Sequence, residues 1–487
     1  MIAVLLILIP LIGGLALFAL KSESGAKGFA LLAAFATVIV SLLGLTLLKQ
    51  PAHLQYDAEW LPMLNSRFKI ALDGMGQLLC LLTAISFPLI FIATWNNTYK
   101  NTSRFYALML LSQAGLMGVF LAMDGLLFYF FWELALIPVY FLSSIWGGEK
   151  RIAATFKFFI YTFVGSLLML VGIIYIYTQT GQSFDIKDWY HTKLPPQSQS
   201  WLFWLFFIAF AIKMPIWPFH TWQPDAYEQS PTAVTMVLSG IMVKMGVFAV
   251  IRWLVPVLPS AAWQWGDTVS LLCIIGMIYA SLVAIRQDDI KRLIAYSSIA
   301  HIGLMCLAIF ATDKSGMQGV MIQMFNHGIN IIGLWIVADA IEQRYGTRKI
   351  SELGGLAQKA PALAILLVIV ALANIALPLT NAFVGEFMMF NGVFSSPATK
   401  YGILDTTAAG ICIILAAVYT LNMIKKVFYG NSNALTATAT ETSAAVKVSL
   451  AIIVVLIFFA GVYPKPMLQL TSDVADNILR LMSAYKQ

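Results

Sequence analysis

A chain of 487 residues that is 60% hydrophobic and only 11% charged lacks the charged surface of a soluble protein, in which about a quarter of the residues carry a charge. Its mean hydropathy of +0.82 and its many long apolar runs predict an integral membrane protein built from helices of about 20 residues. The net charge of +7 lies mostly in connections, so it indicates a role in membrane topology rather than binding to nucleic acid.

Fourteen apolar stretches are expected to cross the bilayer, and they leave no segment long enough for a soluble domain. They lie at residues 1–20, 28–48, 75–97, 105–122, 126–146, 155–178, 201–219, 232–254, 268–286, 290–311, 317–341, 361–395, 405–428 and 447–463. We therefore predict one all-α polytopic membrane domain over residues 1–487. The longest polar connections are 49–74, 179–200 and 429–446, and the last is a linker of small polar residues before the final span.

The expected orientation in the membrane follows from the basic residues. The first stretch, MIAVLLILIPLIGGLALFALK, holds no basic residue before Lys21, so we expect a retained span rather than a cleaved leader. Lysine and arginine are more frequent in the short loops after odd-numbered spans than on the opposite side. The positive-inside rule then places both termini on the non-cytoplasmic side of a bacterial inner membrane.

All four cysteines lie in apolar runs, and none has CxxC spacing. They are Cys80, Cys273, Cys306 and Cys412. This pattern is typical of small hydrophobic core residues, so we expect neither disulfides nor a metal site.

Six ionisable residues lie inside the predicted spans, where a charge is expensive. They are Glu133, Lys213, Lys244, His301, His327 and Glu386. Lys244 is the thirteenth of 23 residues in the eighth span, and Glu133 is the eighth of 21 in the fifth. A charge at this depth costs at least about 2.5–3.5 kcal/mol, so one such group could be a structural ion pair, but six together favour a function.

The chemistry of these groups suits proton transfer. Desolvation disfavours the charged form of a buried lysine, whereas a nearby carboxylate favours the ammonium. A lysine–glutamate pair whose separation changes would therefore gain and lose a proton, which is the elementary step of a proton pump. Histidine titrates near neutrality and suits relay between such sites, although a single mid-span histidine is as often a helix–helix hydrogen-bond partner. Axial haem ligation by His301 and His327 is a weaker alternative, because no second histidine pair or other cofactor signature accompanies them.

Two predicted spans are interrupted by proline. Four prolines follow the seventh apolar run, at Pro215, Pro218, Pro224 and Pro231, and Pro378 lies inside the twelfth. Irregular backbone at membrane depth is tolerated only where it is buried in protein or lines a cavity. We therefore expect both interruptions to lie beside an ion site.

The two interruptions occupy matching positions along the chain. The seventh span is fourth in the set 4–8, and the twelfth is fourth in the set 9–13. We therefore predict two five-helix repeats, at residues 105–254 and 268–428. Because five is odd, the second copy starts on the opposite side of the membrane and the repeats are inverted. The alternative is two unrelated proline kinks.

At these residues the chain resembles the antiporter-like proton-translocating subunits of respiratory complex I, most closely the chain M type. The segment AFAIKMPIWPFHTWQPDAYEQSPTAVTMVLSGIMVKMG is similar to the long signature of that family. FYFFWELALIPVYFL, KRLIAYSSIAHIGL and NHGI are similar to three further elements, so the resemblance covers essentially the whole chain.

The resemblance implies a proton-transfer role for each buried ionisable residue: a glutamate–lysine pair in Glu133 and Lys213, a central relay in Lys244, and a second half-channel in His301, His327 and Glu386. It implies a non-redox subunit of a proton-translocating NADH:quinone oxidoreductase, which holds no cofactor or metal of its own. The implied partners are the lipid bilayer and other membrane-arm subunits, including neighbouring antiporter-like ones. Quinone reduction in those partners would drive the protons.

The chain departs from the family pattern in two places. Leu379 stands in LPLTNAF where glycine is common, and DAYEQSP replaces a DAH-type segment. The local geometry of the second interruption is therefore not implied by the resemblance. The long amphipathic arm of a longer relative is not expected after the last span.

Other functions share parts of this pattern. A subunit of a multisubunit cation/proton antiporter or of a membrane-bound hydrogenase would carry the same buried charges. A membrane scaffold without an ion path would tolerate neutral residues at all of them. A solute permease is disfavoured, because the deep polar groups suit protons and small cations.

Overall fold

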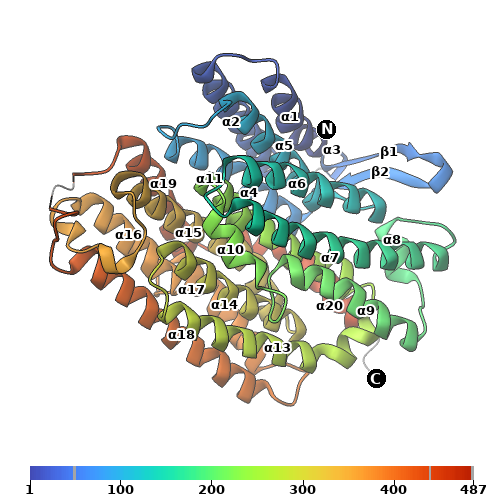
Figure 1. The fold of residues 1–487 in the computed structure, drawn as a ribbon. Helices are drawn as coiled ribbons and strands as arrows, with labels where there is room; N and C mark the ends of the chain where they lie inside the picture. The colour runs from blue at the N-terminus through green and yellow to red at the C-terminus, as the bar shows by residue number, and fades with distance from the viewer. Residues whose placement is uncertain (48–50, 438–439, 484–487) are drawn as a thin grey trace.

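The computed structural model describes residues 1–47, 51–437 and 440–483. Three short segments lie outside the described residues: 48–50, at the end of the predicted second span, 438–439, in the predicted linker, and 484–487. The described chain forms a bundle of long helices with one small β-hairpin (Figure 1).

Eleven helices within the described residues are long and apolar enough to cross a membrane. They are α2 (Glu23–Thr46), α4 (Gly74–Ala93), α5 (Thr102–Leu121), α6 (Gly125–Trp146), α7 (Arg151–Gln179), the continuous helix Thr232–Leu254 with α11 (Thr232–Val237) and α12 (Val243–Ala249), α13 (Pro259–Ile285), α14 (Ile290–Phe310), α15 (Lys314–Tyr345), α18 (Gly402–Ile424) and α19 (Ala444–Val462). The predicted all-α membrane fold is thereby confirmed.

The other three predicted spans correspond to shorter pieces. The first is α1 (Ile2–Leu17), and the remaining two are the interrupted segments α9 (Pro196–Lys213) with α10 (Trp222–Gln229) and α16 (Pro361–Asn374) with α17 (Asn381–Phe394). The number of fourteen membrane crossings and the two inverted repeats stay predictions.

Both predicted interruptions are present as breaks in the backbone. The first separates α9 from α10 and contains Pro215 and Pro218, and the second separates α16 from α17 and contains Pro378. In the second break the backbone of Ala376 (φ 57°) and Leu379 (φ 73°) is left-handed. Leu379 thus adopts the conformation that glycine adopts without strain. The turn is therefore kept although leucine stands where glycine is common.

Aspartates fix where several of these helices begin. Asp73, Asp124, Asp289 and Asp313 precede α4, α6, α14 and α15, and each accepts hydrogen bonds from backbone N–H groups of the first turn. Such N-caps satisfy donors that have no partner within the helix, which matters most where the helix leaves the membrane.

Three stretches expected to be connections or tail form ordered elements instead. Between α2 and α4 lie α3 (Pro51–Leu54) and the antiparallel strands β1 (Gln55–Leu61) and β2 (Ser66–Ala71). The second connection holds α8 (Ile186–His191). The strands were not predicted because most of their side chains are exposed or half-exposed, and the segment is as polar as a loop.

The third unpredicted element is an amphipathic helix, α20 (Lys465–Ser483), which packs on α4 and α15. Its buried side chains, Thr471, Ala475, Ile478 and Met482, recur at the three- and four-residue spacing of one helix face. It passes so close to Gly74 that a Cβ there would lie 1.7 Å from the Leu470 carbonyl oxygen. The periodicity was present in the sequence and could have identified this helix.

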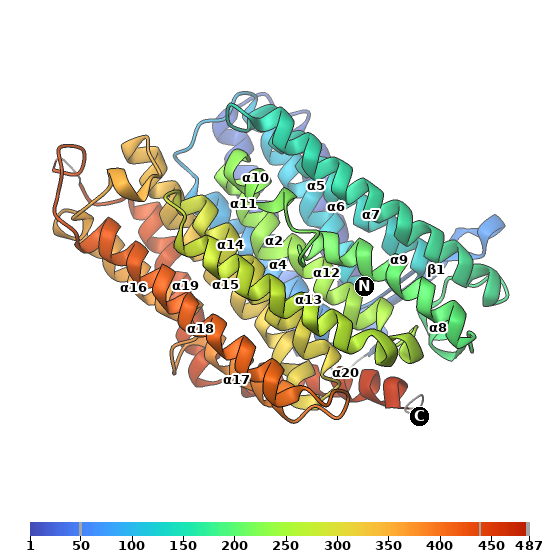
Figure 2. The ribbon, with the colours of Figure 1, turned by 60° about the horizontal axis from the view of Figure 1, so that its bottom comes forward.

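The helices are arranged in layers around a buried centre. Figure 2 shows α5, α6 and α7 along one edge, α16, α17 and α18 along the other, and α11, α12 and α14 between them. The membrane-crossing parts of Thr232–Leu254, α14 and α15 are entirely buried within the described chain, whereas α2, α7, α18 and α19 present exposed apolar side chains. The centre of the bundle is therefore shielded from lipid on all sides.

Both ends of the chain lie near the hairpin end of the bundle (Figure 1). The Met1 amino group donates to the His53 carbonyl oxygen at 3.0 Å, just before β1. At the other terminus, α20 packs against the first residues of α4, which follow β2. The two termini thus share one side of the bundle.

Candidate functional site

The six predicted residues come from six different helices that converge on the buried centre. Their positions are Glu133 in α6, Lys213 at the end of α9, Lys244 in α12, His301 in α14, His327 in α15 and Glu386 in α17. All are buried except Glu133, which is half-buried. Contacts between their side chains divide them into a line of four and a separate pair.

Four of the residues form a continuous line. Lys244 Nζ lies 2.8 Å from His327 Nδ1, the His327 and His301 ring centres are 5.4 Å apart, and His301 Nδ1 lies 3.1 Å from Glu386 Oε1. Residues between 26 and 85 positions apart in sequence are thereby brought within the reach of direct or water-bridged proton transfer.

Lys244 reaches this line from an irregular helix. The turns at 238–242 and 250–254, on both sides of α12, are π-helical, and such turns frequently accompany functional sites. Lys244 Nζ donates to the Ser239 carbonyl oxygen at 2.7 Å as well as to His327 Nδ1. The lysine is thus held between one fixed acceptor and one acceptor that can take its proton.

His327 has the two-sided geometry of a relay. Its Nδ1 accepts from Lys244, while its Nε2 has no hydrogen-bond partner among the described residues. An imidazole that takes a proton at one nitrogen can release one from the other. The centre of the His301 ring lies 5.4 Å from that of His327.

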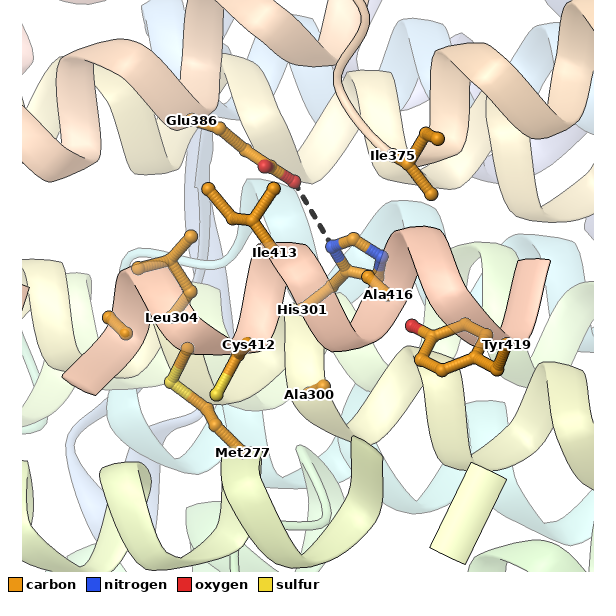
Figure 3. A pocket seen from close by; sticks show the side chains of 11 residues that line it. Met277, Ala300, His301, Leu304, Ile375, Glu386, Cys412, Ile413, Ala416 and Tyr419 are labelled. Atoms are coloured by element: carbon orange, nitrogen blue, oxygen red, sulfur yellow. Dashed lines mark hydrogen bonds and ion pairs between the residues drawn. The ribbon is translucent and has the colours of Figure 1, made fainter. Parts of the chain in front are cut away.

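His301 and Glu386 meet at a small cavity between α13, α14, α17 and α18 (Figure 3). Its volume is about 20 Å³, which is enough for a water molecule. Apolar side chains, including Met277, Leu304 and Ile413, form most of the remaining lining. Figure 3 shows the His301 ring and the Glu386 carboxylate pointing toward each other across this space.

The tautomer of His301 is set by Asn374, the last residue before the second break. The Asn374 amide donates to His301 Nε2 and to Ser297 Oγ, each at 3.4 Å, and Ser297 Oγ also accepts from the Tyr419 hydroxyl at 3.1 Å. Because Nε2 accepts, Nδ1 carries the ring proton and donates it to Glu386. The break in the helix is what exposes Asn374 to this ring.

Glu386 has a second neighbour that the sequence analysis did not include. The Gln323 side-chain amide donates to Glu386 Oε1 at 3.4 Å. Gln323, Asn374, Ser297 and Tyr419 are ordinary polar residues of apolar helices, so no motif marked them. Only Asn374 could have been noticed in the sequence, because it is a polar residue within the apolar run VIVALANIALP.

The predicted glutamate–lysine pair is near but not joined. Lys213 Nζ lies 5.5 Å from the centre of the Trp132 ring. Neither Lys213 Nζ nor Glu133 Oε1 has a hydrogen-bond partner within the described chain. The Glu133 charge nevertheless acts on Lys213 electrostatically. The ring face and the C-terminal end of α9 both favour the ammonium at this position.

The pair is separated from the line by tight helix packing. Gly246, two residues after Lys244, faces the end of α9, and a Cβ at this glycine would lie 2.8 Å from the Phe210 carbonyl oxygen and 2.8 Å from Met214 Cβ. Glycine is therefore what allows α9 to bring Lys213 close to α12. The described residues give no direct hydrogen bond between the two lysines.

No cluster of three or more metal-ligating side chains occurs among the described residues. The four cysteines are buried free thiols.

The chain was compared with known proteins. A sequence family described as NADH:quinone oxidoreductase/Mrp antiporter matches residues 122–412. NADH-quinone oxidoreductase subunit M of Rickettsia conorii is 36% identical over 423 residues, covering 86% of this chain and 85% of that protein. The Pseudomonas aeruginosa protein of the same name is 36% identical over 503 residues, covering 98% of this chain and 97% of that protein.

A solved structure has the same fold. A chain of respiratory complex I from Thermus thermophilus with bound NADH superposes with a TM-score of 0.91 at 28% identity, covering 99% of this chain and 100% of that chain.

Proposed function

The chain belongs to the NADH:quinone oxidoreductase/Mrp antiporter membrane family, and from this premise we propose that it is a proton-translocating subunit in the membrane arm of a NADH:quinone oxidoreductase. The relatives that carry this description cover most of the chain, which supports the assignment to the oxidoreductase branch. The observation that carries the proposal is the buried line Lys244–His327–His301–Glu386.

The line moves a proton from the centre of the bundle to its second half. Lys244 hands a proton to His327 Nδ1, His327 releases one from Nε2, and His301 passes one from Nδ1 to Glu386. Each of these transfers is between groups in hydrogen-bond contact or one water apart. Each transfer leaves the ring proton of a histidine on the other nitrogen, so the line resets by a flip of the imidazole ring, which moves a side chain but no backbone.

Glu133 and Lys213 control loading from the first half. When the carboxylate approaches, the Lys213 ammonium is stabilised, and when the two separate, as here, burial favours release of the proton. Segments 105–254 and 268–428 act as two inverted halves, with α9–α10 and α16–α17 as their broken helices. The structural support for this division is that each break adjoins one end of the proton path.

The subunit works with partner chains in the membrane. Electrons are carried by those partners, and quinone reduction in them drives the transfers. The exposed apolar faces of α2, α7, α18 and α19 suit lipid or neighbouring membrane-arm subunits. We place the protein in a bacterial inner membrane with both termini on the non-cytoplasmic side, which agrees with their common position near the hairpin.

Proton pumping by inverted membrane vesicles that contain the assembled complex tests the proposal. Lys213→Ala, Lys244→Ala and Glu133→Ala should each reduce the rate of proton uptake, whereas Lys400→Ala, at an exposed position, should not. The amount of assembled complex is measured on native gels so that rates refer to equal amounts. Wild-type pumping in all three site variants would contradict the proposal.

A further inference from the structure

The end of the bundle opposite the hairpin contains a polar cavity that the proton line does not use. Its volume is about 320 Å³, room for several water molecules. It lies between the loop after α4, the loop after α6, the end of α10 and the last turns of α15. Charged side chains of both signs line it, among them Glu228, Lys291, Glu342 and Arg348.

Asp339 is the deepest carboxylate of this cavity. It lies six residues, or roughly 9 Å, before the end of α15. The residue is 5% exposed, and its Oδ1 has no hydrogen-bond partner among the described residues. Oδ2 accepts from the Asn97 amide at 3.1 Å. A buried carboxylate oxygen without a protein partner, at the wall of a polar cavity, marks a site for water or a proton.

The charged groups around Asp339 leave it without a full counter-ion. Lys291, which lines the same cavity, is already paired with Glu342, whose Oε2 lies 2.5 Å from its Nζ. Arg348 is likewise shared among Glu228, Glu342 and Asp289. Both cations form ion pairs with other carboxylates, so Asp339 can take up a proton.

Three contacts align Asp339 with Lys244 along two neighbouring helices. The Thr232 hydroxyl interacts with the Asp339 carboxylate, Gly240 faces Ile332, and Lys244 contacts His327. The helix Thr232–Leu254 therefore runs antiparallel to α15, with Thr232 at the cavity and Lys244 at the proton line. The interval from Thr232 to Ser239, whose carbonyl oxygen accepts from Lys244, spans seven residues or about 10 Å.

Polar groups without protein partners fill this interval. Tyr227 Oη, Trp335 Nε1 and both amide atoms of Asn330 are buried and have no hydrogen-bond partner within the described chain. The Tyr227 and Trp335 rings are 5.9 Å apart, and the Thr235 hydroxyl donates to the Tyr227 carbonyl oxygen. Buried polar atoms of this kind are normally satisfied by internal water.

We propose that this cavity is an aqueous inlet, and that Asp339 takes up protons from it and passes them through internal water to Lys244. Hydronium in the cavity protonates the Asp339 carboxylate and becomes water. The carboxylic acid then releases its proton to the water chain beside Thr232, and the chain delivers a proton to the neutral amine of Lys244. This inference rests on the proposed function, because it supplies the lysine that the proton line starts from.

Cysteine accessibility tests the inlet without reference to activity. Asp339→Cys should react with a small cationic methanethiosulfonate reagent added on the side where the cavity opens. Ala338→Cys, its buried neighbour outside the cavity lining, should react several-fold more slowly. The four native thiols are buried, so the wild type gives the background. Equal and negligible labelling of both variants would overturn the inlet.

Proton translocation tests the role of the carboxylate. Asp339→Asn should lower the rate several-fold, Asp339→Glu should retain most of it, and Asp476→Asn, at an exposed carboxylate on α20, should have no effect. Asp339→Asn at the wild-type rate would overturn the proposal.

Two variants of Thr232 test the proposal if Asp339→Asn does not assemble. Thr232→Ser keeps the hydroxyl beside Asp339 and Thr232→Val removes it, so only Thr232→Val should lower the rate of proton translocation. Equal rates in these two variants would overturn the proposal. Lys244→Ala separates this inference from the proposed function. If Lys244→Ala loses proton translocation and Asp339→Asn does not, only the proposed inlet is contradicted. If both variants translocate protons at the wild-type rate, the proposed function is contradicted as well.

Discussion

Lys244 makes two side-chain hydrogen bonds, to a backbone carbonyl and to an imidazole, and neither partner is a carboxylate. A buried ammonium held only by neutral groups is poorly stabilised, which favours the proposed transfer of its proton to His327. The same residue must also become a neutral amine in order to accept the next proton. The capacity to change charge, and not the charge itself, is what this position requires.

Lys244→Arg should therefore be as damaging as Lys244→Ala. Arginine keeps the positive charge, but its guanidinium does not deprotonate in proteins, so it cannot relay a proton. Loss of one positioned proton-transfer group typically costs about 10²–10⁴-fold, and we expect the rate of proton translocation to fall by at least about 10²-fold. Vesicle pumping assays with equal amounts of assembled complex measure this. Near-normal pumping by Lys244→Arg would mean that a fixed charge is sufficient.

At the level of the elements, the broken and irregular helices place the functional groups. The end of α9 presents Lys213, the end of α16 presents Asn374, and π-helical turns flank α12. A regular helix would bury these positions against its own neighbours or direct them elsewhere. Two specific backbone features, the left-handed Leu379 and the close approach at Gly246, hold the breaks in position.

Leu379→Gly should stabilise the protein. The left-handed conformation costs a non-glycine residue about 1–2 kcal/mol, whereas glycine loses roughly 0.5–1 kcal/mol more in chain entropy on folding, which leaves a gain of up to about 1.5 kcal/mol. The Leu379 side chain is 68% exposed, so little packing is lost within this chain. Thermal unfolding of the purified complex in mild detergent measures the shift. A lower unfolding temperature would show that this side chain packs on a neighbouring subunit.

Gly246→Ala should destabilise the contact between α9 and α12. The added Cβ would lie 2.8 Å from a backbone oxygen, and overpacking of this kind costs about 1–3 kcal/mol. Gly410→Ala on α18 is the matched control, because a Cβ there meets nothing within 4 Å. Helix propensity alone predicts that the control is neutral or stabilising. Unfolding temperatures of the two variants should move in opposite directions, and equal shifts would contradict the packing argument.

For the molecule as a whole, ion pairs join the two predicted halves at the end opposite the hairpin. Arg348 of the second half pairs with Glu228 on α10 of the first, and with Glu342 and Asp289 of its own half. Arg292 adds a second connection to Glu228 at 2.8 Å. These contacts fix the broken helix of one half against the helices that carry the proton line in the other.

Arg348→Ala should loosen this junction. The pairs are partly buried, so the expected loss of stability is about 1–3 kcal/mol, between the values for surface and buried pairs. Arg480→Ala, an exposed arginine on α20, should have no comparable effect. Thermal unfolding is measured at low and high salt, because salt screens partly exposed pairs and should shrink the difference from the wild type. A difference that does not depend on salt would indicate lost packing instead.

Much of this organisation could be predicted from the sequence, and the limits are physical. Apolar length predicted the helices, proline predicted the two breaks, and the cost of buried charge singled out residues such as Lys244 and Glu386. The partners of those residues could not be predicted, because the contact of His301 with Glu386 joins positions 85 apart, and only folding brings them together. The roles of Asn374 and Asp339 likewise depend on which neighbour each side chain faces.

Three of the four residues of the proton line, Lys244, His301 and His327, lie in helices whose membrane-crossing parts are buried by the rest of the described chain, and this has an electrical consequence. A membrane that stores energy as a proton gradient must not leak protons along such a path. Here the outer helices cover Thr232–Leu254, α14 and α15. Beside the His301–Glu386 cavity this cover consists of α13 and α18, each of which is exposed on its other face. These two helices therefore separate the cavity from the surroundings of the chain.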